Sequence, residues 1–216
     1  MNMPSDSFNA PVPRRAHCAA CLRAQSACIC RWVTPVDSSV ELLVLQHPLE
    51  VGNAKNSARL LHLCLPGSRL EVGEIFEPAA LDALLHGGGR DPVLLYPDTP
   101  GDVSLGIAPP PALASRLLDD PGQLRLVVLD GTWRKSRKML YVNPALQRLP
   151  RYALQDVQAS AYRIRKAHAP HQLSTLEAAA HALSEMERKT AILQALGAIF
   201  DGFVQQQASR IPRLNP

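Results

Sequence analysis

The sequence lacks an apolar run of about 20 residues, the length that a helix needs to cross a lipid bilayer, so no transmembrane helix is predicted. Residues 1–15, MNMPSDSFNAPVPRR, also lack the apolar stretch of a secretory signal. From these absences we expect a cytoplasmic protein with no membrane partner. The 216 residues, of which 46% are hydrophobic, suit one domain with a buried core.

Several nucleotide-binding and nucleophile motifs are missing as well. The chain has no G-x-x-x-x-G-K-[ST] loop, no G-x-G-x-x-G after a strand and no G-x-S-x-G turn. The triplet Gly87-Gly88-Gly89 follows a predicted helix and therefore indicates where that helix ends. These absences leave kinase-like, P-loop and simple dehydrogenase functions without support.

Strand-like and helix-like patterns alternate from residue 38 onward. Predicted strands cover 39–46, 69–76, 92–97, 124–130 and 151–155. Predicted helices cover 56–65, 78–89, 110–120, 132–141, 174–187 and 190–208. This alternation is typical of an α/β fold, with a mainly parallel sheet flanked by helices. We predict a flexible tail over 1–13, a cysteine segment over 14–34 and one α/β domain over 35–210.

Four cysteines in the N-terminal segment follow the spacing C-x2-C-x6-C-x-C. They are Cys18, Cys21, Cys28 and Cys30. In a reducing compartment this spacing favours a tetrahedral zinc site, a small zinc knuckle with four cysteine ligands, over disulfides. Disulfides and an iron–sulfur cluster are the alternatives, and His17 could replace one sulfur. Four protein ligands leave the metal no open position, so we expect zinc to be structural.

Polar turns follow three of the predicted strands. They are Gln46-His47-Pro48, Tyr96-Pro97-Asp98 and Asp130-Gly131-Thr132. In parallel α/β sheets, ligands bind beyond the carboxyl ends of the strands. We therefore expect the functional site at this edge of the sheet.

The turn after strand 124–130 carries Asp130 and Trp133. A carboxylate at a strand end can accept a proton, orient a polar group or pair with a cation. An indole can stack on a base or on a cation. Alternatively, Asp130 caps the next helix and Trp133 fills the core. The spacing alone leaves both interpretations open.

Two short basic runs stand out. The first lies at the start of a predicted helix, where the helix dipole disfavours cations, and this suggests a negative partner nearby. It holds Arg134, Lys135, Arg137 and Lys138. The second combines Arg163, Arg165 and Lys166 with Tyr162. Cations interleaved with an aromatic ring suit a phosphate backbone with a stacked base. A solvated surface is the alternative.

The ordered set of motifs resembles the DTW-domain tRNA-uridine aminocarboxypropyltransferase family. Asp130, Thr132 and Trp133 match its Asp-x-Thr-Trp signature, and Ser57 stands where the family commonly has Thr. The resemblance runs from about residue 14 to residue 205. Further matching segments are the four cysteines, His47-Pro48-x-Glu50, Asn56 to Leu60, Tyr96-Pro97, Arg137-Lys138-Met139, Ser160 to Arg165 and Ser174-Thr175-x-Glu177.

This resemblance implies a SPOUT-like α/β fold with a knotted pocket for S-adenosylmethionine. It also implies transfer of the 3-amino-3-carboxypropyl group to N3 of a tRNA uridine, with 5′-methylthioadenosine as the other product. Competing hypotheses are an RNA methyltransferase with the same cofactor, a zinc-stapled RNA-binding module without catalysis, and a protein partner facing solvated cations. The oligomeric state, monomer or homodimer, stays open.

The resemblance also assigns roles to residues of this chain. Asp130 is the candidate base or the group that holds the uracil, and Trp133 or Tyr162 could receive the unstacked uridine. The candidate cofactor-binding residues are His47, Tyr96, Pro97, Gly131, Thr132, Tyr162, Arg163, Arg165, Ser174 and Thr175. The candidate RNA-binding residues are Arg134, Lys135, Arg137, Lys138 and Lys166.

Overall fold

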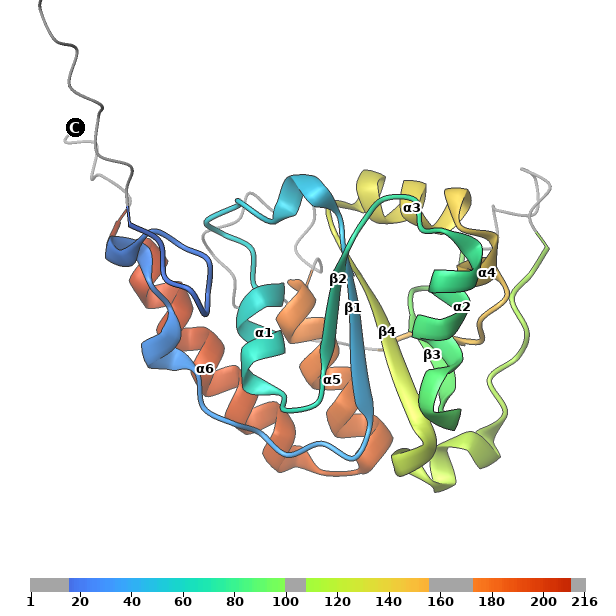
Figure 1. The fold of residues 1–216 in the computed structure, drawn as a ribbon. Helices are drawn as coiled ribbons and strands as arrows, with labels where there is room; N and C mark the ends of the chain where they lie inside the picture. The colour runs from blue at the N-terminus through green and yellow to red at the C-terminus, as the bar shows by residue number, and fades with distance from the viewer. Residues whose placement is uncertain (1–15, 100–107, 156–172, 211–216) are drawn as a thin grey trace, which may run out of the picture.

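A five-stranded sheet forms the centre of the computed structural model, which describes residues 16–99, 108–155 and 173–210. All strand pairs in it are parallel, and the strand order is β2-β1-β4-β3-β5 (Figure 1). The strands are β1 (Glu41–Gln46), β2 (Arg69–Val72), β3 (Asp91–Leu95), β4 (Leu124–Asp130) and β5 (Arg151–Tyr152). The predicted parallel α/β sheet is confirmed.

Helices cover both faces of the sheet (Figure 1). One face carries α1 (Ala58–Cys64), α5 (Thr175–Glu187) and α6 (Thr190–Ala208). The other carries α2 (Pro78–His86), α3 (Trp133–Val142) and α4 (Pro144–Gln147). Alternate strand residues face opposite ways. Thus Leu42 and Val44 of β1 join the first core, whereas Leu43 and Leu45 join the second.

Short 3-10 helices occupy several connections. They are η1 (Gln25–Ala27), η2 (Cys30–Trp32), η3 (Pro48–Glu50), η4 (Gly87–Gly89), η6 (Ser115–Asp119) and η7 (Pro121–Gln123). The helix predicted over 110–120 is wrong, because only η6 forms there. Pro111 disfavours the α conformation at Pro110, and Ala114 before η6 is extended.

The second predicted strand is also shorter than the sequence suggested. It ends at Val72 rather than at residue 76. Gly73 donates its N–H to the carbonyl of Gln46, and a Cβ atom at Gly73 would meet the Phe76 ring at 2.8 Å. The chain therefore bends closely around Phe76, and a larger residue at 73 would require the ring to move. The last predicted strand, 151–155, is likewise reduced to β5.

The cysteine segment packs against the last helix. The indole Nε1 of Trp32 donates to Oε1 of Gln206 at 2.6 Å, and Nε2 of Gln206 donates to the carbonyl of Cys28 at 2.9 Å. The ring of Trp32 lies directly against Gly202. Among the described residues, no helix combines the length and apolar character needed to cross a membrane.

Candidate functional site

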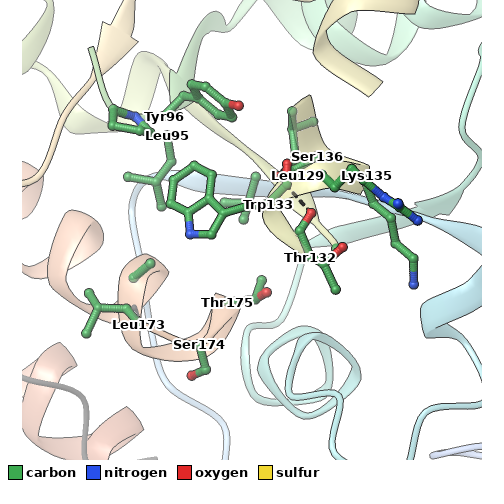
Figure 2. A pocket seen from close by; sticks show the side chains of 15 residues that line it. Leu95, Tyr96, Leu129, Thr132, Trp133, Lys135, Ser136, Leu173, Ser174 and Thr175 are labelled. Carbon is green, nitrogen blue, oxygen red and sulfur yellow. Dashed lines mark hydrogen bonds between the residues drawn. The ribbon is translucent and has the colours of Figure 1, made fainter. Parts of the chain in front are cut away.

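A cavity of about 700 Å³ opens at the carboxyl edge of the sheet (Figure 2). Its walls come from the ends of β3 and β4 and from the beginnings of α3 and α5. The lining residues are Leu95, Tyr96, Pro97, Val128, Leu129, Gly131, Thr132, Trp133, Arg134, Lys135, Ser136, Leu173, Ser174, Thr175 and Ala178. The site predicted at this edge therefore has a space large enough for a cofactor.

Asp130 ends β4 and is buried, with only 2% of its surface exposed. Its Oδ2 atom accepts hydrogen bonds from Nε2 of Gln46 at 2.8 Å and from Nδ2 of Asn56 at 2.6 Å. Its Oδ1 atom accepts from the hydroxyl of Thr175 at 2.6 Å. One carboxylate thus joins the end of β1, the segment before α1 and the first residue of α5.

The alternative in which Asp130 caps the next helix and Trp133 fills the core is not what the structure shows. Thr132, and not Asp130, is the N-cap residue of α3. Trp133 is 49% exposed and so does not fill the core. Its ring meets Tyr96 edge to face, with centroids 5.8 Å apart, and the guanidinium of Arg151 lies over the ring of Tyr96. The exposed indole leaves a flat surface at the cavity wall.

The beginning of α5 forms the opposite wall, where Ser174 and Thr175 lie (Figure 2). The predicted start of this helix at residue 174 is confirmed, and a capping box forms there. Ser174 Oγ accepts from the N–H of Glu177, and the Glu177 carboxylate accepts from the N–H of Ser174. This double cap fixes the first turn of α5 and, with Asp130, the position of the Thr175 hydroxyl.

A smaller cavity of about 70 Å³ lies beside Asp130. It shares Gly131, Ser174 and Thr175 with the large cavity. Its other lining residues are polar or charged: Glu50, Asn53, Lys55, Asn56, Ser57 and Asp130. Asp130 therefore borders the small polar cavity and is not among the residues that line the large one.

Two of the cations in α3 have carboxylate partners within the chain. Lys135 Nζ lies 2.7 Å from the carboxylate of Glu50, which is only 4% exposed. Lys138 Nζ lies 2.7 Å from the carboxylate of Glu74. Lys138 and then His47 hold the pKa of Glu74 below its usual range. The helix dipole suggested a negative partner for these cations, and part of that partner is the carboxylates of Glu50 and Glu74 in the same chain.

The other two α3 cations differ from this pair. Arg137 donates from Nε to the hydroxyl of Tyr141 at 2.6 Å and lies over its ring. Arg134 is exposed and lines the large cavity.

His47 lies at the predicted edge but lines neither cavity. Its Nδ1 accepts from the N–H of Leu49 at 3.1 Å, so the ring proton is on Nε2, which lies 2.8 Å from Glu74. A role for His47 in binding a cofactor stays a prediction. Tyr162, Arg163, Arg165 and Lys166 lie outside the described residues, and their predicted roles stay predictions as well.

The four predicted metal ligands come together. The sulfur atoms of Cys18, Cys21, Cys28 and Cys30 all lie within 4.8 Å of one another. Cys18 and Cys30 are 3.6 Å apart, and Cys21 and Cys28 are 3.8 Å apart. Four sulfurs about 2.3 Å from one tetrahedral ion would be about 3.8 Å apart. All four are free thiols, and His17 is not part of the group.

Two of the four thiols have shifted pKa values. Backbone N–H groups of Cys21 and Ala20 lower the pKa of Cys18 to about 6. Burial raises the pKa of Cys30 to about 12. The thiolate is the form that binds a metal ion, so metal binding here would release protons.

Sequence reasoning expected Gln46 and Asn56 near this edge of the sheet and Thr175 at the cofactor. It missed that all three donate hydrogen bonds to Asp130. The signal was available in part, because Gln46 and Asp130 both end predicted strands. In the sheet they are direct neighbours in register, which brings the amide to the carboxylate.

Comparisons with known proteins identify the family of the chain. The DTW domain family model matches residues 15–208. The chain is 34% identical over 191 residues to tRNA-uridine aminocarboxypropyltransferase 2 of Mus musculus, a match that covers 85% of this chain and 60% of the relative. For the protein of the same name in Drosophila melanogaster, the identity is 31% over 194 residues, with 86% and 72% covered.

A plant relative, tRNA-uridine aminocarboxypropyltransferase A of Arabidopsis thaliana, is 30% identical over 149 residues, 62% of this chain and 54% of its own. No solved structure matches the chain at a significant level. The chain spans about six tenths of the length of the mouse and macaque relatives. Because the family match covers most of the chain, including the signature turn at the cavity, the protein belongs to the DTW-domain family.

Proposed function

We propose that the protein transfers the 3-amino-3-carboxypropyl group of S-adenosylmethionine to N3 of a uridine in tRNA. The observation that carries this proposal is the cavity built by the signature turn, Gly131 to Trp133, in a chain whose relatives bear the name of this activity. S-adenosylmethionine supplies the electrophilic carbon, and its sulfur leaves in 5′-methylthioadenosine, a neutral thioether. All other contributions come from the chain.

The large cavity offers two kinds of surface for the cofactor. Its apolar part, with Leu95, Tyr96 and Leu129, suits the adenosyl group. Its polar part, with the hydroxyls of Ser174 and Thr175, suits the amino-acid end of the molecule. Arg163 and Arg165 are further candidates for the cofactor carboxylate, outside the described residues.

The attacking N3 atom must lose its proton, and Asp130 is the candidate base from the sequence. Its position supports a different role. Both carboxylate oxygens already accept hydrogen bonds from protein groups, and Asp130 is absent from the lining of the large cavity. We infer that Asp130 acts by positioning Thr175 and the signature turn, since alignment of the reactants alone can lower a barrier considerably.

The tRNA contacts follow from the exposed side of α3. Trp133 presents an exposed indole on which an unstacked uracil can lie. Arg134 is exposed beside the cavity and suits a backbone phosphate. Lys135 and Lys138 contribute less net charge, because Glu50 and Glu74 lie against them.

Two finer assignments complete the proposal. The cysteine cluster binds structural Zn²⁺, because four sulfurs at this spacing fit one tetrahedral ion and leave no open position. The fold is SPOUT-like with a knotted pocket. The parallel sheet and the cavity at its carboxyl edge support this, whereas the segment 156–172 that enters α5 lies outside the described residues.

The test is the mass of nucleosides from unmodified tRNA after incubation with the purified protein and S-adenosylmethionine. A uridine heavier by one aminocarboxypropyl group, formed together with 5′-methylthioadenosine, supports the proposal. A methylated uridine would still support binding of S-adenosylmethionine in the cavity, but it would exclude transfer of the aminocarboxypropyl group. No new nucleoside from several tRNAs that bind tightly would favour the binding module without catalysis.

A further inference from the structure

Arg23 of the cysteine knuckle, residues 16–34, binds the backbone of the segment that leads into α1. Arg23 lies between Cys21 and Cys28. Its Nη1 donates to the carbonyl of Ala54, and its Nη2 donates to the carbonyl of Asn56, each at 2.6 Å. Charged donors on two carbonyls two residues apart hold this stretch of backbone in one conformation.

A second arginine crosses the same boundary in the opposite direction. Arg59, in α1, donates from Nε and Nη2 to the carbonyl of Ala20, at 3.3 and 3.0 Å. Ala20 lies between Cys18 and Cys21. The knuckle and the segment that leads into α1 are therefore joined by four hydrogen bonds from two charged side chains.

The contact continues directly to the buried carboxylate. Asn56 is 9% exposed, and its Nδ2 donates to Asp130 at 2.6 Å. Its Oδ1 accepts from Nε2 of Gln46 at 3.2 Å and from the N–H of Ala58 at 3.0 Å. Arg23 holds the backbone of the same residue whose side chain holds Asp130, which in turn binds the hydroxyl of Thr175 on the cavity wall.

The conformation of the knuckle depends on its cysteines. Its regular structure is limited to the two three-residue 3-10 helices η1 and η2 and an isolated β-bridge between His17 and Ala24. Leu22 next to Arg23 has a positive φ of 60°. A segment with so little regular structure needs a cross-link to hold its shape, and four sulfurs within 4.8 Å of one another fit a metal ion for that purpose.

We propose that Arg23 is a positioning residue that couples the metal-held knuckle to the Asn56–Asp130 centre. Loss of the metal or of the Arg23 guanidinium loosens the 54–58 segment, and with it the alignment of the cavity wall. Only the catalytic readout rests on the proposed function, because the loosening of 54–58 is a property of the chain itself.

The simpler view is that the knuckle merely anchors the N-terminal part of the chain to α6. Arg31 provides the matched control for that view. It is adjacent to Cys30, donates from Nε to Gln206 at 3.2 Å and lies over the ring of Trp32. Its contacts are with α6 and with Trp32 of the knuckle. The guanidinium of Arg23 likewise lies over a ring of α6, that of Phe203, but it also binds the 54–56 backbone.

The experiment compares Arg23→Gln and Arg31→Gln with the parent protein, all loaded with Zn²⁺ and checked for metal content and melting temperature. Hydrogen exchange is measured at the amides of residues 56–58, before and after a zinc chelator is added. We expect Arg23→Gln to speed this exchange by about tenfold or more, the effect of losing charged hydrogen bonds. Arg31→Gln should leave it unchanged.

The chelator should speed exchange at the same amides in the parent and add less in Arg23→Gln, because both changes break the Arg23 connection and only the contact of Arg59 with Ala20 is then left to lose. Arg23→Lys, which keeps a charged donor, should restore part of the protection, and it replaces Arg23→Gln if that variant loses metal. Equal exchange in the parent and in a metal-loaded Arg23 variant would overturn the proposal.

The kinetic readout is the kcat of nucleoside formation, which we expect to fall by about tenfold or more in Arg23→Gln while the melting temperature stays near that of the parent. If exchange responds as expected but the parent modifies no tRNA, the proposed function fails and the coupling stands. If the parent is active and Arg23→Gln has an unchanged kcat, the coupling fails and the proposed function stands.

Discussion

Thr175 donates its hydroxyl hydrogen to Oδ1 of Asp130 over 2.6 Å, although 45 residues separate the two in the chain. This bond joins the end of the most buried strand to the beginning of a helix on the cavity wall. With Gln46 and Asn56 on the other carboxylate oxygen, it gives Asp130 three donors and a well-defined orientation.

Substitution of Asp130 should separate a positioning role from that of a base. Asp130→Ala removes the acceptor of three donors, of which Gln46 and Asn56 are buried, at a cost on the order of 1–3 kcal/mol for each buried group. We expect it to unfold at clearly lower urea. Asp130→Asn keeps one acceptor oxygen for Gln46 and Asn56, and the Thr175 hydroxyl can turn to accept. It should retain measurable transfer. A folded Asp130→Asn protein that binds S-adenosylmethionine but has lost all transfer would instead identify Asp130 as the base.

Substitution of Trp133 should weaken tRNA binding more than it destabilises the fold. Its side chain is half exposed, so Trp133→Ala should change the free energy of unfolding by less than about 1 kcal/mol. Loss of a stacking surface costs about 1–3 kcal/mol per base, so KM for tRNA should rise about tenfold or more. Trp133→Phe should be intermediate. Steady-state kinetics that show the same KM for all three proteins would exclude stacking on this residue.

The cations of α3 should contribute unequally to tRNA binding. Removing a phosphate contact lowers the slope of log affinity against log salt by about one. We expect that change for Arg134→Ala, whose side chain is exposed. Lys138→Ala should change the slope less, because Glu74 lies 2.7 Å from the ammonium group. Titrations of labelled tRNA at several salt concentrations measure both slopes, and a larger effect of Lys138→Ala would contradict this assignment.

The docking of the knuckle on α6 should depend on one glycine. A Cβ atom at Gly202 would clash with the ring of Trp32, so Gly202→Ala should destabilise the protein by about 1–3 kcal/mol. Gly197 in the same helix has nothing within 4 Å of such an atom. Gly197→Ala is the control and should add up to about 1 kcal/mol through helix propensity. Urea unfolding measures both, and a Gly202→Ala protein as stable as Gly197→Ala would show that Trp32 moves freely.

Glu187 should make stability depend on pH in the acid range. Burial raises its pKa, but Lys189, the Ser38 hydroxyl and the Val40 N–H together lower it below the usual range. A lowered pKa stabilises the fold above the unfolded value of about 4.3, and this contribution disappears as pH falls through the folded value.

Glu187→Gln keeps the oxygen that accepts from Ser38 and Val40 but cannot titrate. We expect its unfolding free energy to fall less than that of the parent as the pH is lowered from neutral into the acid range. Chemical denaturation across that range tests this, and parallel curves for the two proteins would assign the acid sensitivity elsewhere.

Local patterns in the sequence were enough to predict most helices and strands. The aliphatic run 124–130 predicted a buried strand, and Ser174 with Glu177 predicted the start of α5, because burial on two faces and capping are local requirements. Spacing also predicted the cysteine cluster, since ligands of one ion must lie close together. The prediction failed over 110–120, where apolar spacing was helical but the chain is extended at Ala114.

The sequence by itself determined the parallel α/β class, the edge of the sheet where the site lies and the four sulfurs that meet. Only the tertiary structure decided that Asp130 is surrounded by three donors, that Trp133 is exposed, and that Arg23 holds the backbone of Asn56. The physical reason is distance along the chain. Strand register and helix packing bring these groups together across tens of residues, and no local preference records which side chains will meet there.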